Sequence, residues 1–411
     1  MINDHESKYR WWVLGLAAIT NTMVVAVQGM CLPVLFKEIS ADLQLNLVQV
    51  GMIWGISALP GIFSSLLGGA IGDRFGPKRI LVLGCLLAGL AGALRGLAVD
   101  FYSLAGGMFL LGLLTPIISM NNFKTCGMWF SRKQFGLASG VLSMGMALGF
   151  LSSSMLSATF LSPWLGGWRN VLFLYGGIAV AFCIPWFLIQ KPEAEHAIRA
   201  GTSGADNLVK NLAVVAKMRN IWLFGMTIFG ISGGIQGLLG YLPLYLRGVG
   251  WSGPMADSAS GAFHTVSLLC VIPIALLSDS LRTRKKILLV ANTMISSGAA
   301  LLSVASGGLV WVAVLLAGMV RDGFMAVFMT AIVETEGVGP ALAGTATGMV
   351  MVFSGLGNMI APPLGNSLAA GGANLPFLFW ACLSLIGLVG LGLSREKIFR
   401  PAKAADLNDL G

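Results

Sequence analysis

Three charged side chains lie well inside apolar segments of the sequence. Arg321 and Asp322 stand near the middle of the apolar stretch 309–333, and Lys124 lies in the second half of the stretch 101–130. A charge inside a bilayer costs several kcal/mol unless it is paired or faces water, so each residue is a candidate functional residue. A guanidinium and an ammonium group can replace the water that an anion loses on binding. The pattern therefore predicts a site for a small anion.

Each of these charges also has a structural interpretation. Arg321 could neutralise Asp322 or an acid on another helix, although adjacent helical residues point about 100° apart, which argues against a direct pair. Lys124 could extend its side chain to the membrane surface. With the internal repeat described below, Arg321 corresponds to Leu113, which shares a helix face with Lys124 to within about 20°. Two cations could then face one cavity from related helices.

Amide side chains could complete such a site. Gln28 and Gln236 occupy corresponding positions in two apolar segments, and Asn121 and Asn122 come shortly before Lys124. Amides both donate and accept hydrogen bonds, so all four are candidate substrate-binding residues. The alternative for each of them is a structural hydrogen bond between helices.

A coupling proton would need a titratable group within the membrane. His264 lies in the outer half of the apolar segment 255–277, and this histidine and Asp322 are the candidates for that role. The alternative for His264 is a structural histidine whose ring nitrogens are hydrogen-bonded.

The other polar residues of these segments indicate no further chemistry. Arg95 is expected to reach the membrane interface, and Glu334 and Glu336 are expected to lie at a gate or at the surface. The six cysteines fall within apolar runs and lack the spacing of metal ligands. The sequence has no phosphate-binding loop and no nucleophile motif, so we expect neither an enzyme nor a cofactor.

The composition is that of a membrane protein. Of the 411 residues, 56% are hydrophobic and 10% are charged, and the mean hydropathy is +0.83. A soluble protein carries about 25% charged residues. We therefore expect an all-α membrane protein with about twelve transmembrane helices of roughly 20 residues each. The expected spans are 11–35, 48–71, 80–99, 101–130, 136–160, 168–189, 221–246, 255–277, 287–306, 309–333, 341–364 and 375–393.

The cations predict how the chain is oriented. Twenty Lys and Arg residues lie at one side of these spans, and only Lys37, Arg169 and Arg247 lie at the other. The positive-inside rule then places both termini in the cytoplasm. The same pattern explains the net charge of +9 without nucleic-acid binding. The expected units are an N-terminal six-helix bundle (1–189), a cytoplasmic linker (190–220), a C-terminal six-helix bundle (221–394) and a cytoplasmic tail (395–411).

The two halves of the sequence repeat with an offset of 208 residues. The matches are Gln28-Gly29 with Gln236-Gly237, Gly136-x-x-x-Gly140 with Gly344-x-x-x-Gly348, and Gly149 with Gly357. A single match is weak evidence for a repeat because glycine is abundant. A constant offset across several spans is stronger evidence. The repeat indicates two pseudo-symmetric bundles.

A short polar stretch, GGAIGDRFGPKRIL at 68–81, joins the second and third expected spans. Its Gly76–Pro77 pair predicts a tight turn, and its basic residues mark the cytoplasmic side. The pattern G-x-x-x-D-R-x-G-x-[KR]-[KR] resembles the loop 2–3 signature of the major facilitator superfamily. The resemblance implies two six-helix bundles around a cavity lined by spans 1, 4, 7 and 10, which work by alternating access. The loop then supplies a candidate conformational gate, formed by Asp73, Arg74, Lys78 and Arg79.

Two features that the family's proton-coupled and drug-exporting members carry are absent. No arginine stands near Gly107-Met108 in span 4, and Gly145-Met146 replaces a Gly-Pro pair in span 5. Trp129-Phe130 before the loop 4–5 and Gly167-Trp168-Arg169 before span 6 do match the family. The two departures argue against drug:proton antiport.

The residues and the resemblance together predict secondary transport of a small anion across the plasma (inner) membrane. The substrate would be a carboxylate or a similar organic or inorganic anion, with protons as the candidate coupling ion. The nitrate/nitrite, cyanate and monocarboxylate carriers of the family have related features, and no motif decides between them. The alternatives are efflux of amphipathic compounds, supported by 20 Met and 11 Trp, and a non-transporting membrane receptor. We expect a monomer in the lipid bilayer.

Overall fold

The computed structural model describes residues 4–189, 205–281 and 283–394. Within these ranges the chain is helical and contains no strand. The predicted tail and much of the predicted linker lie outside the described residues. The helices of the first half are α1 (Asp4–Thr20), η1 (Asn21–Ala26), α2 (Val27–Asp42), α3 (Leu47–Ile56), α4 (Ala58–Phe75), α5 (Pro77–Leu94), η2 (Arg95–Leu97), α6 (Phe101–Trp129), α7 (Arg132–Leu156), η3 (Ser157–Leu161), α8 (Ser162–Leu165), α9 (Trp168–Ala181) and α10 (Cys183–Leu188).

The second half continues the same pattern after one short helix that precedes span 7. Its helices are α12 (Ala205–Val215), α13 (Arg219–Gly248), α14 (Gly253–Leu281), α15 (Arg284–Leu302), α16 (Leu309–Met319), α17 (Arg321–Val333), α18 (Gly339–Ser367), η4 (Leu368–Ala370) and α19 (Leu375–Leu393). Together the described residues form 12 helical segments that are long and apolar enough to cross a membrane. The predicted all-α membrane fold is confirmed.

The ends of several helices follow directly from local sequence. Asn46 caps α3 in a capping box with Gln49, and Asp100 caps α6 in the same way with Ser103. The turn predicted between spans 2 and 3 lies at Gly76, whose φ of 85° is in the left-handed region that favours glycine. Pro77 then occupies the first turn of α5, where its missing N–H has no helical acceptor.

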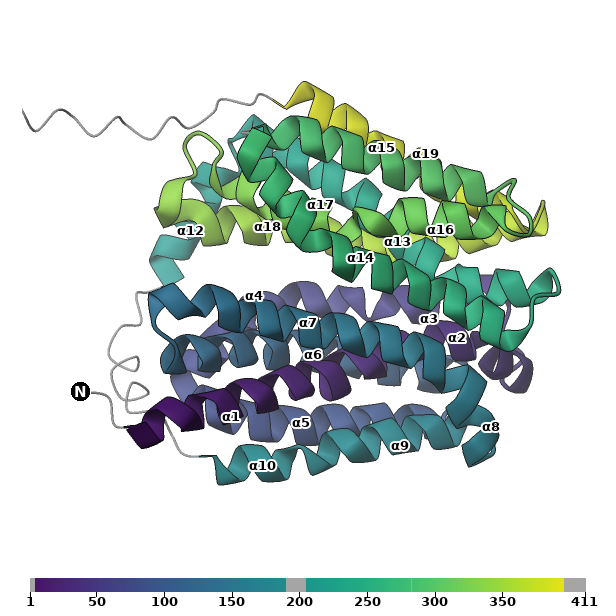
Figure 1. Ribbon diagram of the computed structural model, residues 1–411, viewed down its shortest axis with the longest axis horizontal. Helices are drawn as coiled ribbons and strands as arrows, with labels where there is room; N and C mark the ends of the chain where they lie inside the picture. The colour runs from purple at the N-terminus through teal and green to yellow at the C-terminus, as the bar shows by residue number, and fades with distance from the viewer. Residues whose placement is uncertain (1–3, 190–204, 282, 395–411) are drawn as a thin grey trace, which may run out of the picture.

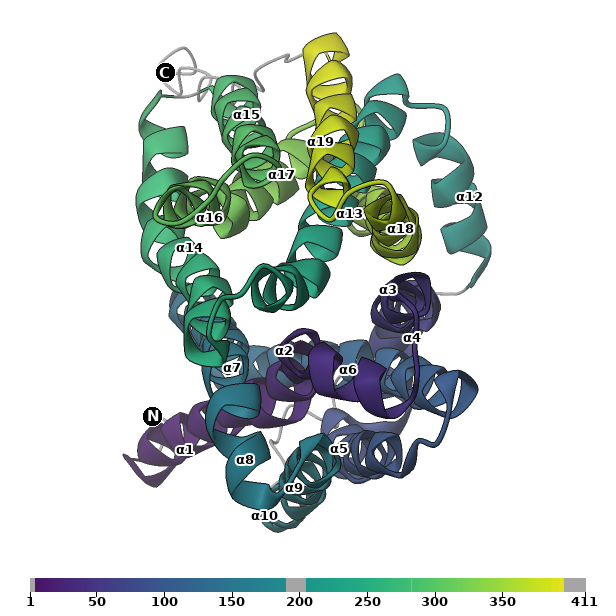
Figure 2. The ribbon, with the colours of Figure 1, turned by 90° about the vertical axis from the view of Figure 1, so that its right-hand side faces the viewer.

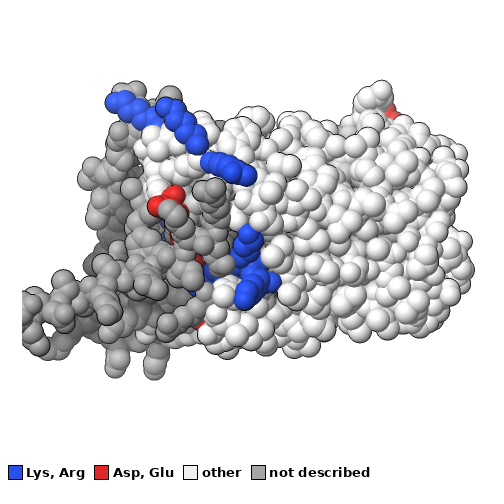
Figure 3. Space-filling model, turned by 90° about the horizontal axis from the view of Figure 1, so that it is seen from above, with Lys and Arg blue, Asp and Glu red and all other residues white. Residues whose placement is uncertain are grey.

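The helices form two bundles, one from each half of the chain (Figures 1 and 2). α1 begins, and α10 and α19 end, at the same end of the molecule, which we call the terminal end; the opposite end is the distal end. Figure 3 shows Lys and Arg side chains gathered toward the terminal end, while most of the rest of that face is white. Exposed cations of this region include Lys210, Lys217, Arg219 and Lys286. The residue boundaries predicted for the two bundles stay predictions.

Equivalent glycine contacts support the internal repeat. A side chain at Gly149 in α7 would meet the backbone of Thr22 in span 1, and one at Gly357 in α18 would meet the backbone of Phe229 in span 7. Small residues allow helices in a membrane to approach closely. The fifth and eleventh spans therefore pack in the same way against the first span of their own half.

The two bundles contact each other through α3 with α18 and α7 with α14 (Figure 2). Gly51 and Gly55 of α3 lie so close to α18 that an added Cβ would stand 2.7 Å from Pro363 Cα and 2.6 Å from the Met359 carbonyl oxygen. A Cβ at Gly261 of α14 would lie 2.6 Å from Met155 Cγ of α7. The halves are therefore tightly packed against each other toward the distal end.

Candidate functional site

Span 10, which carries the predicted anion-binding arginine, is interrupted at Val320. α16 ends at Met319 and α17 begins at Arg321, with Val320 between them at φ −104° and ψ −5°. Arg321 Nη1 lies 2.6 Å from Asp322 Oδ1, so these neighbours form an ion pair. The expectation that they would point apart is wrong, because it assumed an uninterrupted helix.

Three side chains from other helices surround this pair, and we call the five residues the Arg321 cluster. The Asp322 backbone N–H donates to Ser267 Oγ of α14 over 3.1 Å. Phe150 of α7 has its ring centroid 5.9 Å from the Arg321 guanidinium carbon and 5.4 Å from the His264 ring of α14. The cluster thus joins a residue of the first half to four residues of the second.

The ion pair is accessible whereas the histidine is not. The side chains of Arg321 and Asp322 each have an exposed fraction of 29%. His264 is buried, and its Nε2 atom has no hydrogen-bond partner among the described residues. Part of the guanidinium surface is therefore not covered by other protein atoms. Sequence reasoning did not identify Phe150, because an aromatic residue in an apolar span has no distinguishing local signal.

Lys124 and Gln236 lie on the two other helices that were predicted to line a central site. Lys124 is half-buried in α6, and Gln236 is half-buried in α13. The Gln236 carbonyl oxygen accepts a hydrogen bond from Trp54 Nε1 of α3 over 2.7 Å, across the two halves. The position of Gln236 is therefore tied to the contact between the bundles.

Asn121 and Asn122 are completely buried and hold helices of the first half together. Asn121 Nδ2 donates to the Gly68 carbonyl oxygen of α4 over 3.1 Å, and Asn122 Nδ2 donates to Asn21 Oδ1 of η1 over 2.8 Å. These contacts correspond to the structural alternative for the two amides. Their role in substrate binding stays a prediction.

Gln28 is buried against Arg95 of span 3. Arg95 Nη1 donates to the Gln28 carbonyl oxygen over 2.8 Å, Nη2 lies 3.4 Å from Gln28 Oε1, and Nη1 lies 3.3 Å from Met108 Sδ. The expectation that Arg95 reaches the membrane interface is wrong, since its exposed fraction is 0%. Gly107 leaves room for this arginine, because an added Cβ would lie 2.6 Å from Arg95 Cγ.

The buried Arg95 has no carboxylate partner among the described residues, which leads to a stability prediction. Replacing Gln28 by Glu should place a carboxylate beside the guanidinium and raise the free energy of unfolding by about 1–2 kcal/mol, after the cost of burying the new charge. Thermal unfolding of the purified protein measures this change. Gln134→Glu is the matched control, because Gln134 Oε1 accepts from Arg10 Nη1 in a less buried place. Destabilisation by Gln28→Glu would show that burying the new carboxylate costs more than its pairing with Arg95 returns.

A buried ion pair at the distal end contacts the first half of the chain. Arg247 Nη2 at the end of α13 lies 2.5 Å from Asp257 Oδ1 in α14, and their side chains are 8% and 1% exposed. Asp257 Oδ2 accepts a hydrogen bond from Thr159 Oγ1 of η3 over 2.6 Å. A hydrogen bond to a charged group is stronger than one between neutral groups, so this bond holds the halves together. The sequence does carry a signal for this contact, a lone acid near the start of span 8, although the predicted site residues did not include it.

A third side chain crosses between the halves nearby. Asn366 Nδ2 of α18 donates to the Leu47 carbonyl oxygen of α3 over 2.8 Å. We call this bond, the Trp54–Gln236 bond and the Thr159–Asp257 bond the distal contacts. All three lie in the distal part of the interface, where Gly51 and Gly55 also pack against α18.

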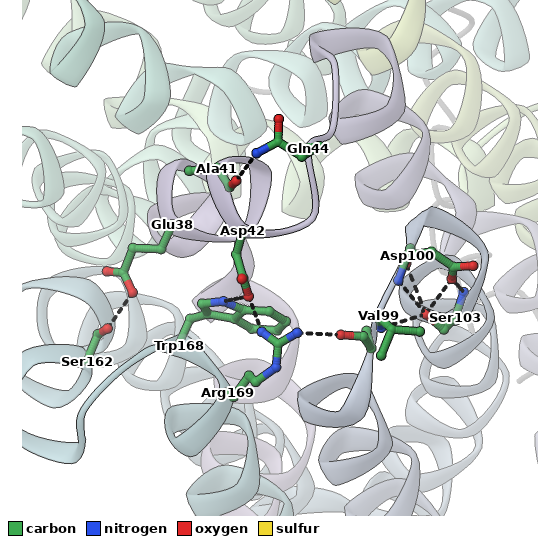
Figure 4. A network of polar contacts seen from close by, with 11 residues as sticks. Glu38, Ala41, Asp42, Gln44, Val99, Asp100, Ser103, Ser162, Trp168 and Arg169 are labelled. Atoms are coloured by element: carbon green, nitrogen blue, oxygen red, sulfur yellow. Dashed lines mark hydrogen bonds and ion pairs between the residues drawn. The ribbon is translucent and has the colours of Figure 1, made fainter.

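The polar contacts that Figure 4 draws at the distal end stay within the first half. Asp42 accepts from Trp168 Nε1 over 3.0 Å and pairs with Arg169, and Arg169 Nη2 donates to the Ala98 carbonyl oxygen over 2.8 Å. Ser162 Oγ donates to Glu38 Oε2. These bonds fix the loops of one bundle and do not join it to the other.

The predicted gate residues lie at the terminal end, in and after α4. Arg74 and Arg79 are exposed, and Lys78 Nζ donates to the Ile189 carbonyl oxygen at the end of α10. The side chain of Asp73 lies outside the described residues. In the second half, Lys285 Nζ likewise donates to the Gly392 carbonyl oxygen near the end of α19, over 2.8 Å. Both lysines thus bind the last helix of their own half, which repeats the pseudo-symmetry.

The charges expected near the end of span 10 also have partners. Arg284 pairs with Glu334, at 3.3 Å between Nη2 and Oε1, and with Asp279. This contact stays within the second half. Among the described residues, no three His, Cys, Asp or Glu side chains gather so that they could hold a metal ion.

Comparison with known proteins decides the family. The model described as Major Facilitator Superfamily matches residues 14–349. The chain belongs to the Major Facilitator Superfamily. It is therefore a multi-pass membrane transporter and not an enzyme.

Several relatives from this superfamily are similar over most of the chain. The probable sulfoacetate transporter of Cupriavidus necator is 21% identical, over 98% of this chain and 96% of the relative. The cis,cis-muconate transport protein of Acinetobacter baylyi is 25% identical, over 98% and 99%. A probable nitrate/nitrite antiporter of Thermus thermophilus is 26% identical, over 59% and 55%.

Solved structures share the fold at low sequence identity. A bacterial homolog of the human lysosomal transporter Spinster, in an inward-facing and occupied conformation, has a TM-score of 0.72 at 14% identity and covers 93% of this chain and 96% of that chain. A nucleoside transporter has a TM-score of 0.74 at 12% identity, over 92% and 97%. These likenesses establish the fold of the superfamily member and not its substrate.

Proposed function

We propose that this superfamily member is a secondary transporter of a small organic anion, in which Arg321 binds the substrate's negative charge. The observation that carries the proposal is the partly exposed guanidinium within span 10, in contact with helices of both halves. A guanidinium binds carboxylates with two parallel hydrogen bonds and keeps its charge at any physiological pH. Lys124 and Gln236, both half-buried on neighbouring spans, are the further substrate-binding candidates.

The names of the relatives support an anionic substrate. Sulfoacetate, cis,cis-muconate and nitrate or nitrite are all small anions, and so is the 3-(3-hydroxy-phenyl)propionate of a transporter from Escherichia coli that is 25% identical. The chain aligns with three of these relatives over at least 88% of its length. We infer an organic carboxylate as the substrate class.

Alternating access gives the contacts between the halves a role in the transport cycle. The distal contacts close one end of the interface, so the described conformation corresponds to one in which substrate would exchange at the terminal end. Opening of the distal end requires these bonds to break. The charged loop at the terminal end contains Asp73, Arg74, Lys78 and Arg79. It would act in the conformation in which the terminal end is closed.

Uptake into proteoliposomes tests the function directly. The panel contains labelled cis,cis-muconate, 3-(3-hydroxyphenyl)propionate, sulfoacetate and nitrate, each measured with and without a pH gradient. We expect saturable transport of at least one carboxylate that a pH gradient accelerates. Transport of amphipathic cations alone would favour efflux, and an absence of any flux together with specific binding would favour a receptor.

The orientation is a separate proposal, with both termini and the linker in the cytoplasm of a cell whose inner membrane holds the protein. The gathering of cations at the terminal end supports it (Figure 3). A cysteine introduced at Ser203, in the linker, should stay unlabelled when intact cells are treated with a thiol reagent that does not cross membranes. Labelling there, at a rate like that of a cysteine at Val99, would reverse the orientation.

A further inference from the structure

Arg321 already holds a carboxylate, and that carboxylate belongs to its neighbour. Asp322 Oδ1 lies 2.6 Å from Arg321 Nη1, in the place where a substrate carboxylate would bind. Both side chains are partly exposed, each to 29%, so neither is sealed inside the protein. A substrate anion must therefore compete with Asp322 for Arg321.

Charge balance decides how that competition ends. An anion that joins an ionised Asp322 would place two negative charges beside one guanidinium, and like charges at such short range disfavour each other strongly. The repulsion is larger inside a membrane than in water, because the effective dielectric constant is lower. A proton on Asp322 removes one of the two charges and frees the guanidinium.

We propose that Asp322 takes up one proton whenever Arg321 binds a substrate carboxylate, so that the adjacent pair couples proton and anion. The proposal rests on the proposed function and adds its coupling residue and stoichiometry. The proton comes from water, bonds to a carboxylate oxygen of Asp322, and returns to water when the anion leaves. Before and after binding, the guanidinium faces one negative charge.

The groups around Asp322 fit this exchange. Among the described residues, the titratable or charged groups that face it are Arg321 on α17 itself and His264 on α14. Ser267 of α14 accepts from the Asp322 backbone N–H, and α7 faces the cluster with the uncharged ring of Phe150. His264 is buried beside that ring and has an unpartnered Nε2 among the described residues, so it is the one competing proton site in the cluster.

The test is the pH dependence of carboxylate binding to the purified full-length protein, measured by calorimetry between pH 6 and 8. The panel carboxylates stay ionised in this range, so a pH effect arises in the protein. One proton per anion predicts that the affinity of the wild type rises about tenfold for each unit by which the pH falls. Calorimetry of the wild type in buffers of different ionisation enthalpy should show one proton taken up per carboxylate bound. This measurement requires no variant.

Asp322→Asn provides the second part of the test, because asparagine has the size of the protonated acid and carries no charge. This variant should bind the carboxylates with an affinity that does not change with pH and exceeds that of the wild type at pH 8 at least tenfold. Asp42→Asn is the matched control, since Asp42 also pairs with an arginine but lies at the distal surface. Carboxylate binding by Asp42→Asn should depend on pH as steeply as binding by the wild type does.

Three results would overturn the proposal. Binding to the wild type without proton uptake would leave anion transport intact and remove the coupling role of Asp322. An unchanged pH slope in Asp322→Asn, together with its loss in His264→Gln, would place the proton on the histidine. If no panel carboxylate binds the wild type at any pH, the proposed function itself fails, and this inference fails with it.

Discussion

Replacing Arg321 by alanine is expected to abolish anion transport while the protein still inserts and folds. A guanidinium that binds the substrate leaves nothing to offset the anion's dehydration once it is removed. Hydrogen bonds to charged groups contribute about 1.5–3 kcal/mol each, so binding should weaken roughly tenfold to hundredfold. Arg321→Lys should restore transport only in part, because an ammonium group cannot form two parallel bonds. Uptake into proteoliposomes and equilibrium binding measure the two effects.

The ion pair with Asp322 makes the competing structural interpretation testable. Because Arg321 pairs with Asp322, its removal leaves the Asp322 charge unpaired and costs stability in either interpretation. The structural interpretation gives Arg321 no other role. Removal of both charges would then restore stability and transport together. The double variant Arg321→Ala/Asp322→Ala should instead be stable and inactive. A stable double variant that transports would show that Arg321 is a structural charge.

Thr159→Val is expected to shift the protein toward a conformation that is open at the distal end. Valine has the shape of threonine and cannot donate the hydrogen bond that Asp257 accepts across the halves. The loss of a hydrogen bond to a buried charge, about 1.5–3 kcal/mol, should raise the ratio of distal-open to distal-closed molecules roughly tenfold to hundredfold. Arg247 keeps Asp257 paired, so the second bundle should stay folded.

Distances between spin labels on cysteines at Val99 and Val249 report this shift, since both residues are exposed and lie at the distal ends of opposite halves. Ser162→Ala is the matched control. It removes a neighbouring hydroxyl whose bond to Glu38 stays within the first half, so the distance distribution should not change. A Thr159→Val distribution identical to that of the wild type would mean that the other distal contacts suffice to close this end.

The large-scale architecture could be predicted because it depends on segment length and on hydropathy. Twelve apolar stretches, a repeat of constant offset and the turn at Gly76–Pro77 are all local or periodic signals. The prediction that Arg321 is a charge inside a span rests on the same kind of signal. Each of these features can be read without knowing which helices touch.

The partners of the polar side chains could not be predicted in this way. The Arg321–Asp322 pair was foreseen only as an alternative, because ideal helix geometry argued against it and the interruption at Val320 was not predicted from the sequence. The burial of Arg95 depends on space left by Gly107 on another helix, and the bond from Thr159 depends on how the two bundles meet. Such contacts join residues that are distant in sequence, and a single sequence carries no record of them.

Two of the three distal contacts end on main-chain oxygens, those of Leu47 and Gln236, and this has a consequence for mutational scans of the protein. Every residue type supplies a carbonyl oxygen, so no substitution at Leu47 can delete that acceptor. A scan should therefore find Trp54 and Asn366 sensitive to change, while Leu47 tolerates many apolar residues. Pairwise covariation between homologues would be weak at these positions for the same reason. Each of these two bonds is thus encoded in the side chain of one partner only, whereas the Thr159–Asp257 bond depends on both side chains.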